Sequence, residues 1–170
     1  IAKWNEKSYT NLDLIGFYWM NEVMSEFFGM YGENLDEALT SRVRDYLHSL
    51  KVNENWMRFF WIPSNLKFVA EDLGIDNSPW KTDSTGEEIF DAVIFQPNYM
   101  QGFYEWRSYK TLEEVAQVAY ANGFGVEMEF NECIYLDNGC LTRCLEYFDA
   151  GEKYGFNTSV QAFVFGNTQL

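Results

Sequence analysis

The sequence predicts an α/β fold made of parallel βα units, in a single domain over residues 1–170. Near-continuous apolar segments, rich in aromatic and β-branched residues, are typical of parallel strands that are covered on both faces. Amphipathic helical patterns lie between these segments, and a regular alternation of strands and helices indicates a parallel sheet. No low-complexity linker divides the chain.

The spacing of the strand segments suggests a barrel. They recur roughly every 40 residues, as in a (β/α)8 barrel, which needs about 250 residues in all. The chain has 170 residues, so it is expected to be either the C-terminal part of a larger barrel or an open doubly wound sheet. Ile1 as the first residue, in place of Met, favours the barrel fragment.

Five segments are expected to form the strands. In chain order they are Leu12–Met20, Met57–Pro63, Asp91–Asn98, Gly123–Phe130 and Thr158–Gly166.

Three longer helices are expected between the strands. Asn34–Leu50 has an apolar stripe and Asn34 as its cap, while Thr111–Gly123 opens with a capping box and stops at glycine. Asn138–Gly151 carries apolar residues along one side, at Leu141, Leu145 and Phe148. Two shorter helical pieces are expected at Asn65–Gly74 and Thr85–Phe90.

Polar or aromatic side chains follow the apolar part of every strand. In parallel α/β folds the ligand site lies outside the carboxyl ends of the strands, so these side chains are the candidate site residues. They are Tyr18, Trp19, Asn21, Glu22, Trp61, Gln96, Asn98, Tyr99, Glu127 and Glu129. The alternatives are a solvated rim or helix caps for the polar groups, and core packing for each aromatic ring.

Glu127 and Glu129 are the most informative pair. Side chains alternate along a strand, so both carboxylates point to one face. Two neighbouring charges in a dry core would be very costly, and we therefore expect them to face a water-filled cavity. Glycoside hydrolysis needs two carboxylates, one protonated acid and one ionised nucleophile or base, and Glu22 is the candidate distal partner. Glu127 could help to hold the acid protonated, because like charges in one pocket cannot all ionise cheaply.

Composition narrows the class of partner. The chain is 47% hydrophobic and 19% aromatic, with a net charge of −14. Such a surface repels nucleic acids and anionic membranes, whereas a neutral carbohydrate fits an acidic, aromatic-rich chain. No apolar run approaches the roughly 20 residues that span a bilayer, so membrane insertion is not expected.

The sequence predicts neither a metal nor another cofactor. Cys140 and Cys144 are four residues apart, as on one face of a helix, which favours two packed thiols over a bridge. With Cys133 they supply three ligands, and His48 lies far away in sequence, so a tetrahedral zinc site lacks its fourth ligand.

The stretches GFYWMNE, WIP, FQPNYM and GVEMEF resemble the bacterial domain-of-unknown-function 4855 family, which is grouped with glycoside-hydrolase-like TIM barrels. The resemblance implies that the five strands are the fourth to eighth of a barrel whose N-terminal units are missing here. This implied arrangement is similar to that of the retaining glycosidases. In those enzymes the acid follows an Asn at the end of strand four, and the nucleophile ends strand seven. Asn21 and Glu22 fit the first position. Glu129 is preferred to Glu127 for the second, because it lies nearer the end of its strand.

The leading hypothesis is therefore a glycoside hydrolase, retaining rather than inverting, acting on a bacterial or dietary polysaccharide or oligosaccharide. Glu22 and Glu129 would be catalytic. Glu127, Asn21, Gln96, Asn98 and Tyr99 would bind sugar hydroxyls, while Tyr18, Trp19 and Trp61 would line the cavity. The family resemblance implies a secreted, periplasmic or cell-surface protein.

Two other functions remain open. A non-catalytic carbohydrate-binding barrel would keep the aromatic floor but would not need two opposed carboxylates. A structural fragment would need its exposed sheet edge covered by a partner, either the missing N-terminal part of the barrel or another subunit.

Overall fold

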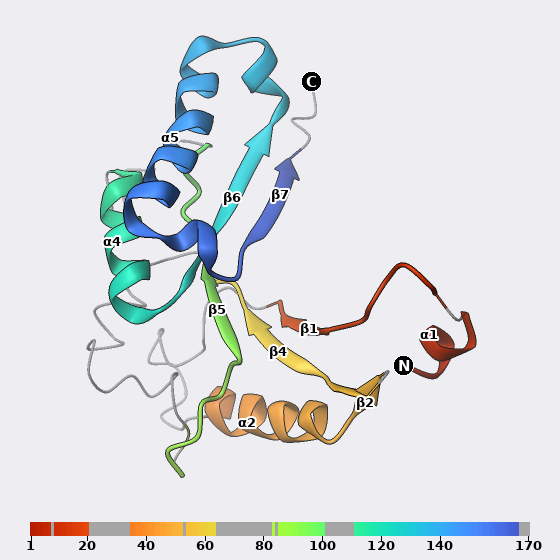
Figure 1. The fold of residues 1–170 in the computed structure, drawn as a ribbon. Coiled ribbons are helices and arrows are strands. Elements are labelled where there is room, and N and C mark those ends of the chain that lie inside the picture. The colour runs from red at the N-terminus through yellow and green to blue at the C-terminus, as the bar shows by residue number, and fades with distance from the viewer. Residues whose placement is uncertain are drawn as a thin grey trace.

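The structure, a computed structural model, describes residues 1–7, 9–20, 35–52, 54–63, 83, 85–100 and 111–166. Its main feature is a sheet of five parallel strands in the order β1-β4-β5-β6-β7, curled like half of a barrel (Figure 1). The strands are β1 (Gly16–Trp19), β4 (Arg58–Trp61), β5 (Ala92–Phe95), β6 (Gly125–Asn131) and β7 (Ala162–Gly166). All five expected strands and the parallel βα architecture are therefore confirmed.

The remaining elements are mostly helical. The α-helices are α1 (Ala2–Lys7), α2 (Leu35–His48), α4 (Leu112–Asn122) and α5 (Asn138–Tyr154). Two 3₁₀ turns, η2 (Glu132–Tyr135) and η3 (Phe156–Thr158), flank α5, and β2 (Lys51–Val52) pairs with β3 (Asn55–Trp56) in a small antiparallel hairpin. The three longer expected helices are confirmed, whereas Asn34 and the piece Asn65–Gly74 lie outside the described residues.

Local chemistry sets the ends of α4 and α5. The Thr111 hydroxyl accepts the N–H of Glu114 at the start of α4, and Gly123 ends the helix in the left-handed region, at φ 69°. Glycine adopts this conformation without a Cβ penalty. Helix α5 runs past Gly151, where the sequence predicted its end, and stops at Gly155, with φ 77°. Gly151 instead packs against the ring of Phe156.

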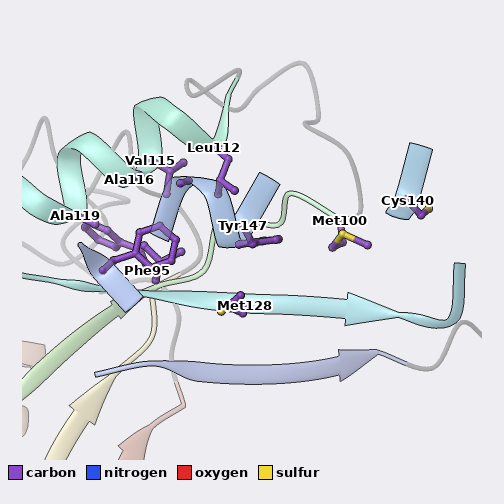
Figure 2. Close-up of a cluster of buried hydrophobic side chains, with 12 residues drawn as sticks. Phe95, Met100, Leu112, Val115, Ala116, Ala119, Met128, Cys140 and Tyr147 are labelled. Atoms are coloured by element: carbon purple, nitrogen blue, oxygen red, sulfur yellow. The ribbon is translucent and has the colours of Figure 1, made fainter. Parts of the chain in front are cut away.

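The helices cover one face of the sheet, here called the outer face. Near β4, Phe59 and Trp61 pack with Leu47 of α2. Near β6, a second buried cluster joins strand residues to α4 and α5 (Figure 2). Its members include Phe95, Leu112, Val115, Val126, Met128 and Tyr147. Because side chains alternate along each strand, the opposite or inner face carries Tyr18, Phe60, Ile94, Glu127 and Glu129.

The segment Thr85–Phe90 is not a helix, and this prediction was wrong. The Asp83 carboxylate accepts the N–H groups of Thr85 and Glu87, at 2.8 and 3.1 Å, and Gly86 has φ 86°. A side chain that bonds nearby backbone in this way competes directly with helix formation. Buried Arg44 of α2 also bonds the Asp83 carboxylate, at 2.8 Å, and thus ties the turn to the helix.

Asp83 should make stability depend on pH. The Thr85 hydroxyl, above all, and the Arg44 guanidinium hold the pKa of Asp83 well below its usual range. A lowered folded-state pKa means that the stabilisation is complete above about pH 4 and is lost as the pH falls further. We expect Asp83→Asn to remove this pH-dependent part of the free energy of unfolding, as measured by urea unfolding between pH 7 and pH 2. The exposed control Asp149→Asn should retain it, and equal pH dependence of wild type and Asp83→Asn would contradict the assignment.

The cysteines pair differently from the prediction. Cys133 in η2 and Cys140 in α5 form a disulfide, and Cys144 is the free cysteine of the described chain. The prediction that Cys140 and Cys144 are two packed thiols was therefore wrong. Since η2 follows β6 directly, the turn brings Cys133 back beside the first turn of α5, and the bridge links the end of β6 to this helix.

Candidate functional site

Strand β6 places Glu127 and Glu129 on the inner face of the sheet. Val126 and Met128 alternate with them and enter the outer-face core, which fixes the parity of the strand. Its register is also constrained at Gly125, where a Cβ atom would lie 1.9 Å from the carbonyl oxygen of Val160. The packing of Val126 and Met128 on the outer face therefore holds the two carboxylates on the inner face.

Both carboxylates are shielded from solvent. Glu127 is 3% exposed and Glu129 is 4% exposed, so neither stands in the water-filled mouth that the sequence predicted. A buried carboxylate is strongly destabilising unless hydrogen-bond donors replace the lost water. The groups around Glu129 are therefore the key to what the pair can do.

Two donors converge on one oxygen of Glu129. The backbone N–H of Tyr99 lies 2.8 Å from Glu129 Oε2, and the hydroxyl of Tyr147 lies 3.0 Å from the same atom. Tyr99 follows β5, whereas Tyr147 comes from the middle of α5, so three separate elements meet at this carboxylate. Hydrogen bonds to an ionised carboxylate are roughly twice as strong as bonds between neutral groups.

Asn98 turns the chain so that the Tyr99 N–H can reach Glu129. Its φ of 53° lies in the left-handed region, where Asn is several-fold enriched over other non-glycine residues. The side chain is 6% exposed, and its Nδ2 approaches the carbonyl oxygen of Gln96 at 3.5 Å. Such backbone outliers cluster at functional sites because the surrounding structure must hold them in place.

The phenol of Tyr99 points away from Glu129, toward α5. Its hydroxyl donates to the carboxylate of Glu146, and burial, followed by this bond, raises the pKa of Tyr99 to about 12. The ring lines a cavity of about 340 Å³ between α4 and α5, together with Glu113, Asp149, Lys153 and Tyr154. Tyr99 therefore contributes its backbone, and not its phenol, to the Glu129 environment.

The predicted aromatic residues are divided between the two faces. Trp61 is 2% exposed and stacks on Phe90 with ring centroids 5.3 Å apart, and the Trp19 ring lies edge-on to Phe59 at 6.0 Å. Both rings pack in the outer-face core, and the buried Nε1 of Trp19 has no hydrogen-bond acceptor among the described residues. Tyr18 instead lies on the inner face and is 44% exposed, so its ring is accessible.

Three other predicted residues have different outcomes. Asn21 and Glu22 lie outside the described residues. Gln96 comes directly after the last residue pair of β5 with β6, Phe95 with Val126, and thus lies level with Glu127. The structure therefore places Gln96 and Asn98 in the segment that follows β5, beside β6, and this segment contacts Glu129 through the backbone N–H of Tyr99.

Tyr147 is a site residue that the sequence did not reveal. On α5 the stripe of Leu141, Leu145 and Phe148 is the most apolar, yet these three side chains are 43 to 55% exposed. The buried positions are Cys140, Tyr147, Ala150 and Gly151. Their spacing of seven, ten and eleven residues from Cys140 also fits one face of a helix. This spacing was the signal in the sequence that could have marked Tyr147 as buried.

Two general properties of the described chain bear on the site. Within its described ranges, no three His, Cys, Asp or Glu side chains cluster so as to hold a metal ion. Among the same residues, no helix is both long enough and apolar enough to cross a membrane.

Comparison with known proteins gives one match. A family model described as Domain of unknown function (DUF4855) matches residues 1–170. No curated protein and no solved structure matches the chain.

Proposed function

The chain belongs to the family described as Domain of unknown function (DUF4855), and we propose that it is a glycoside hydrolase acting on a neutral carbohydrate. One observation carries the proposal. A buried carboxylate, Glu129, is held by two donors on the inner face of β6, with Glu127 two residues away on the same face. Glycosidic bond cleavage requires two carboxylates in unlike environments, and Glu129 supplies one of them.

The proposed role of Glu129 follows from this arrangement, whereas the roles of Asn21 and Glu22 rest on the family resemblance. Glu129, ionised and fixed, attacks the anomeric carbon or activates water, and Glu22 donates a proton to the leaving oxygen. Asn21, Gln96, Asn98 and Glu127 bind sugar hydroxyls. The exposed ring of Tyr18 offers an apolar face for stacking against a sugar ring, whereas Trp19 and Trp61 are left out because the core holds them.

Burial of Glu129 suits this chemistry. A carboxylate in a shielded site loses its hydration shell, and fixed donors substitute for it without reorganising during the reaction. The disulfide between Cys133 and Cys140 adds support for a secreted, periplasmic or cell-surface protein, because such bonds persist mainly in oxidising compartments.

The direct test is a screen for hydrolysis. The protein is incubated with a panel of neutral polysaccharides and oligosaccharides, and the release of reducing ends is followed, with chromatography of the products. Hydrolysis of at least one glycan is expected. Glycan binding without product release across the panel would favour a non-catalytic carbohydrate-binding barrel instead.

A second candidate function, a part of a larger assembly, is favoured by the bare outer face of β7. Phe163 and Phe165 are 63% and 61% exposed, although they pair in register with Met128 and Phe130 of β6, which pack in the core beneath α5. Leu141, Leu145 and Phe148 extend this surface. At about 200 Å² for each large side chain, on the order of 500 Å² of apolar surface is exposed, near the upper limit for a monomer.

The geometry indicates what would cover this surface. In the described chain β7 pairs on one side with β6, and β1 pairs on one side with β4, so both edges of the parallel sheet are open. A parallel strand beside β7 would pair with the backbone N–H and C=O groups at this edge, and the helix that follows it would cover Phe163 and Phe165. The proposed partner is therefore a set of further βα units that completes the barrel.

The isolated chain should consequently self-associate through this face. Static light scattering is expected to give a mass above the 20.0 kDa of one chain. The double replacement of Phe163→Ser and Phe165→Ser should shift the mass toward the monomer, because it removes the apolar contact. Tyr120→Ser, at an exposed aromatic residue on α4, is the control and should change nothing. A wild-type chain that stays monomeric at high concentration would contradict this candidate function.

A further inference from the structure

Tyr147 is a fully buried tyrosine whose hydroxyl ends at a carboxylate. The residue is 0% exposed in the middle of α5. A buried phenol needs a hydrogen-bond partner, and phenylalanine would fill the same apolar space without that requirement. The partner here is Oε2 of Glu129, at 3.0 Å.

We propose that Tyr147 is a positioning residue for Glu129, which it holds ionised and in one orientation on the inner face of β6. The proposal rests on the proposed function, within which it makes Glu129 the nucleophile or base of the carboxylate pair and excludes it from the acid role. It also assigns to α5, a helix of the outer layer, a direct influence on the catalytic carboxylate.

Both groups at Oε2 donate to it, the backbone N–H of Tyr99 and the hydroxyl of Tyr147. The Tyr99 group is a backbone N–H, which has no acceptor capacity. Burial, followed by the charge of Glu129, raises the pKa of Tyr147, so its hydroxyl keeps its proton. Two donors directed at a carboxylate favour its ionised form over its protonated form.

The Tyr147 ring is held firmly enough to position another group. It lies edge-on to the ring of Tyr99 at 5.8 Å and makes an edge contact with Phe130 at 6.0 Å. The disulfide between Cys133 and Cys140 links the first turn of α5 to the segment that follows β6. The helix that carries the donor and the strand that carries the acceptor are therefore cross-linked.

The surrounding charges oppose one another. Glu127 on β6 is a like charge that disfavours ionisation of Glu129. Farther out on α5, Glu146 bonds the phenol of Tyr99, and Arg143 partly offsets the charge of Glu146 there. Since Glu127 disfavours the charged form and the donors at Oε2 favour it, loss of one donor should raise the titration midpoint of Glu129 measurably.

The test is the titration of Glu129 in Tyr147→Phe, followed by NMR with ¹³C-labelled glutamate carboxyl groups and assigned through Glu129→Gln. Loss of one charge-assisted hydrogen bond should move the titration midpoint of Glu129 up by roughly one pH unit. Tyr154→Phe is the matched control, because the Tyr154 hydroxyl on the same helix bonds Glu113 instead. The control should leave the midpoint unchanged.

An unchanged midpoint in folded Tyr147→Phe would overturn the proposal. If that variant does not fold, Tyr147→3-fluorotyrosine decides. Its more acidic phenol is a stronger donor of nearly the same size, so the midpoint should fall, and a midpoint that stays or rises would overturn the proposal. Neither measurement uses a substrate. Absence of hydrolysis would therefore refute the proposed function but not the effect of Tyr147 on the titration of Glu129. Once a substrate is known, the acid limb of kcat should move up in Tyr147→Phe, with little change in KM.

Discussion

Glu129→Gln is expected to lower hydrolysis by about 10³-fold or more, while the protein stays folded. A positioned carboxylate that acts as nucleophile or base contributes this order of rate enhancement, and glutamine cannot replace its charge. The fold should survive because the glutamine carbonyl oxygen can still accept from the Tyr99 N–H and the Tyr147 hydroxyl. The measurement is kcat/KM on the glycan identified by screening, with circular dichroism and thermal unfolding as checks of the fold.

Two further variants sharpen this result. Glu127→Gln should reduce the rate less than Glu129→Gln, because neither the Tyr99 N–H nor the Tyr147 hydroxyl is directed at Glu127. Glu113→Gln is the control for removing one negative charge, since Glu113 lies on α4 and pairs with Lys153 at 2.6 Å. Glu129→Gln with near wild-type activity, or Glu127→Gln with the larger loss, would refute the assignment of Glu129.

Features of the fold that depend on neighbouring residues could be predicted from the sequence. Strand β6 is an example, because the alternation around Glu127 and Glu129 already places both on one face. The start of α4 is another, since the bond from the Glu114 N–H to the Thr111 hydroxyl spans three residues. In each case the deciding contact lies within one element, and the pattern of residue types records it.

Features that depend on distant residues could not be predicted. Tyr147 reaches Glu129 across 18 residues, and nothing local distinguishes it from a core tyrosine. The helical prediction for Thr85–Phe90 failed in part for a similar reason, because Arg44 on the distant helix α2 stabilises the turn that Asp83 makes with this segment. The burial of Glu129 also depends on tertiary packing, so a charge that looked solvated in the sequence is shielded in the structure.

Phe59→Ala should be the most destabilising of the proposed substitutions. Phe59 is 1% exposed in the outer-face core, with its ring centroid 4.7 Å from that of Phe90. Truncation of a buried phenylalanine costs about 3–5 kcal/mol, a large part of the usual total of 5–15 kcal/mol. The midpoint temperature of thermal unfolding, measured by calorimetry, should fall by roughly 10 °C or more.

Phe60→Ala is the matched control, because the two residues are adjacent on β4 and point to opposite faces. Phe60 lies on the inner face and is half-buried, so its truncation should cost less than half as much. Equal losses would contradict looser packing on the inner face at Phe60 than on the outer face at Phe59. If further βα units close the sheet, the inner face becomes a barrel interior packed with side chains. The cost of Phe60→Ala should then rise toward that of Phe59→Ala, which makes Phe60 a sensor of barrel completion.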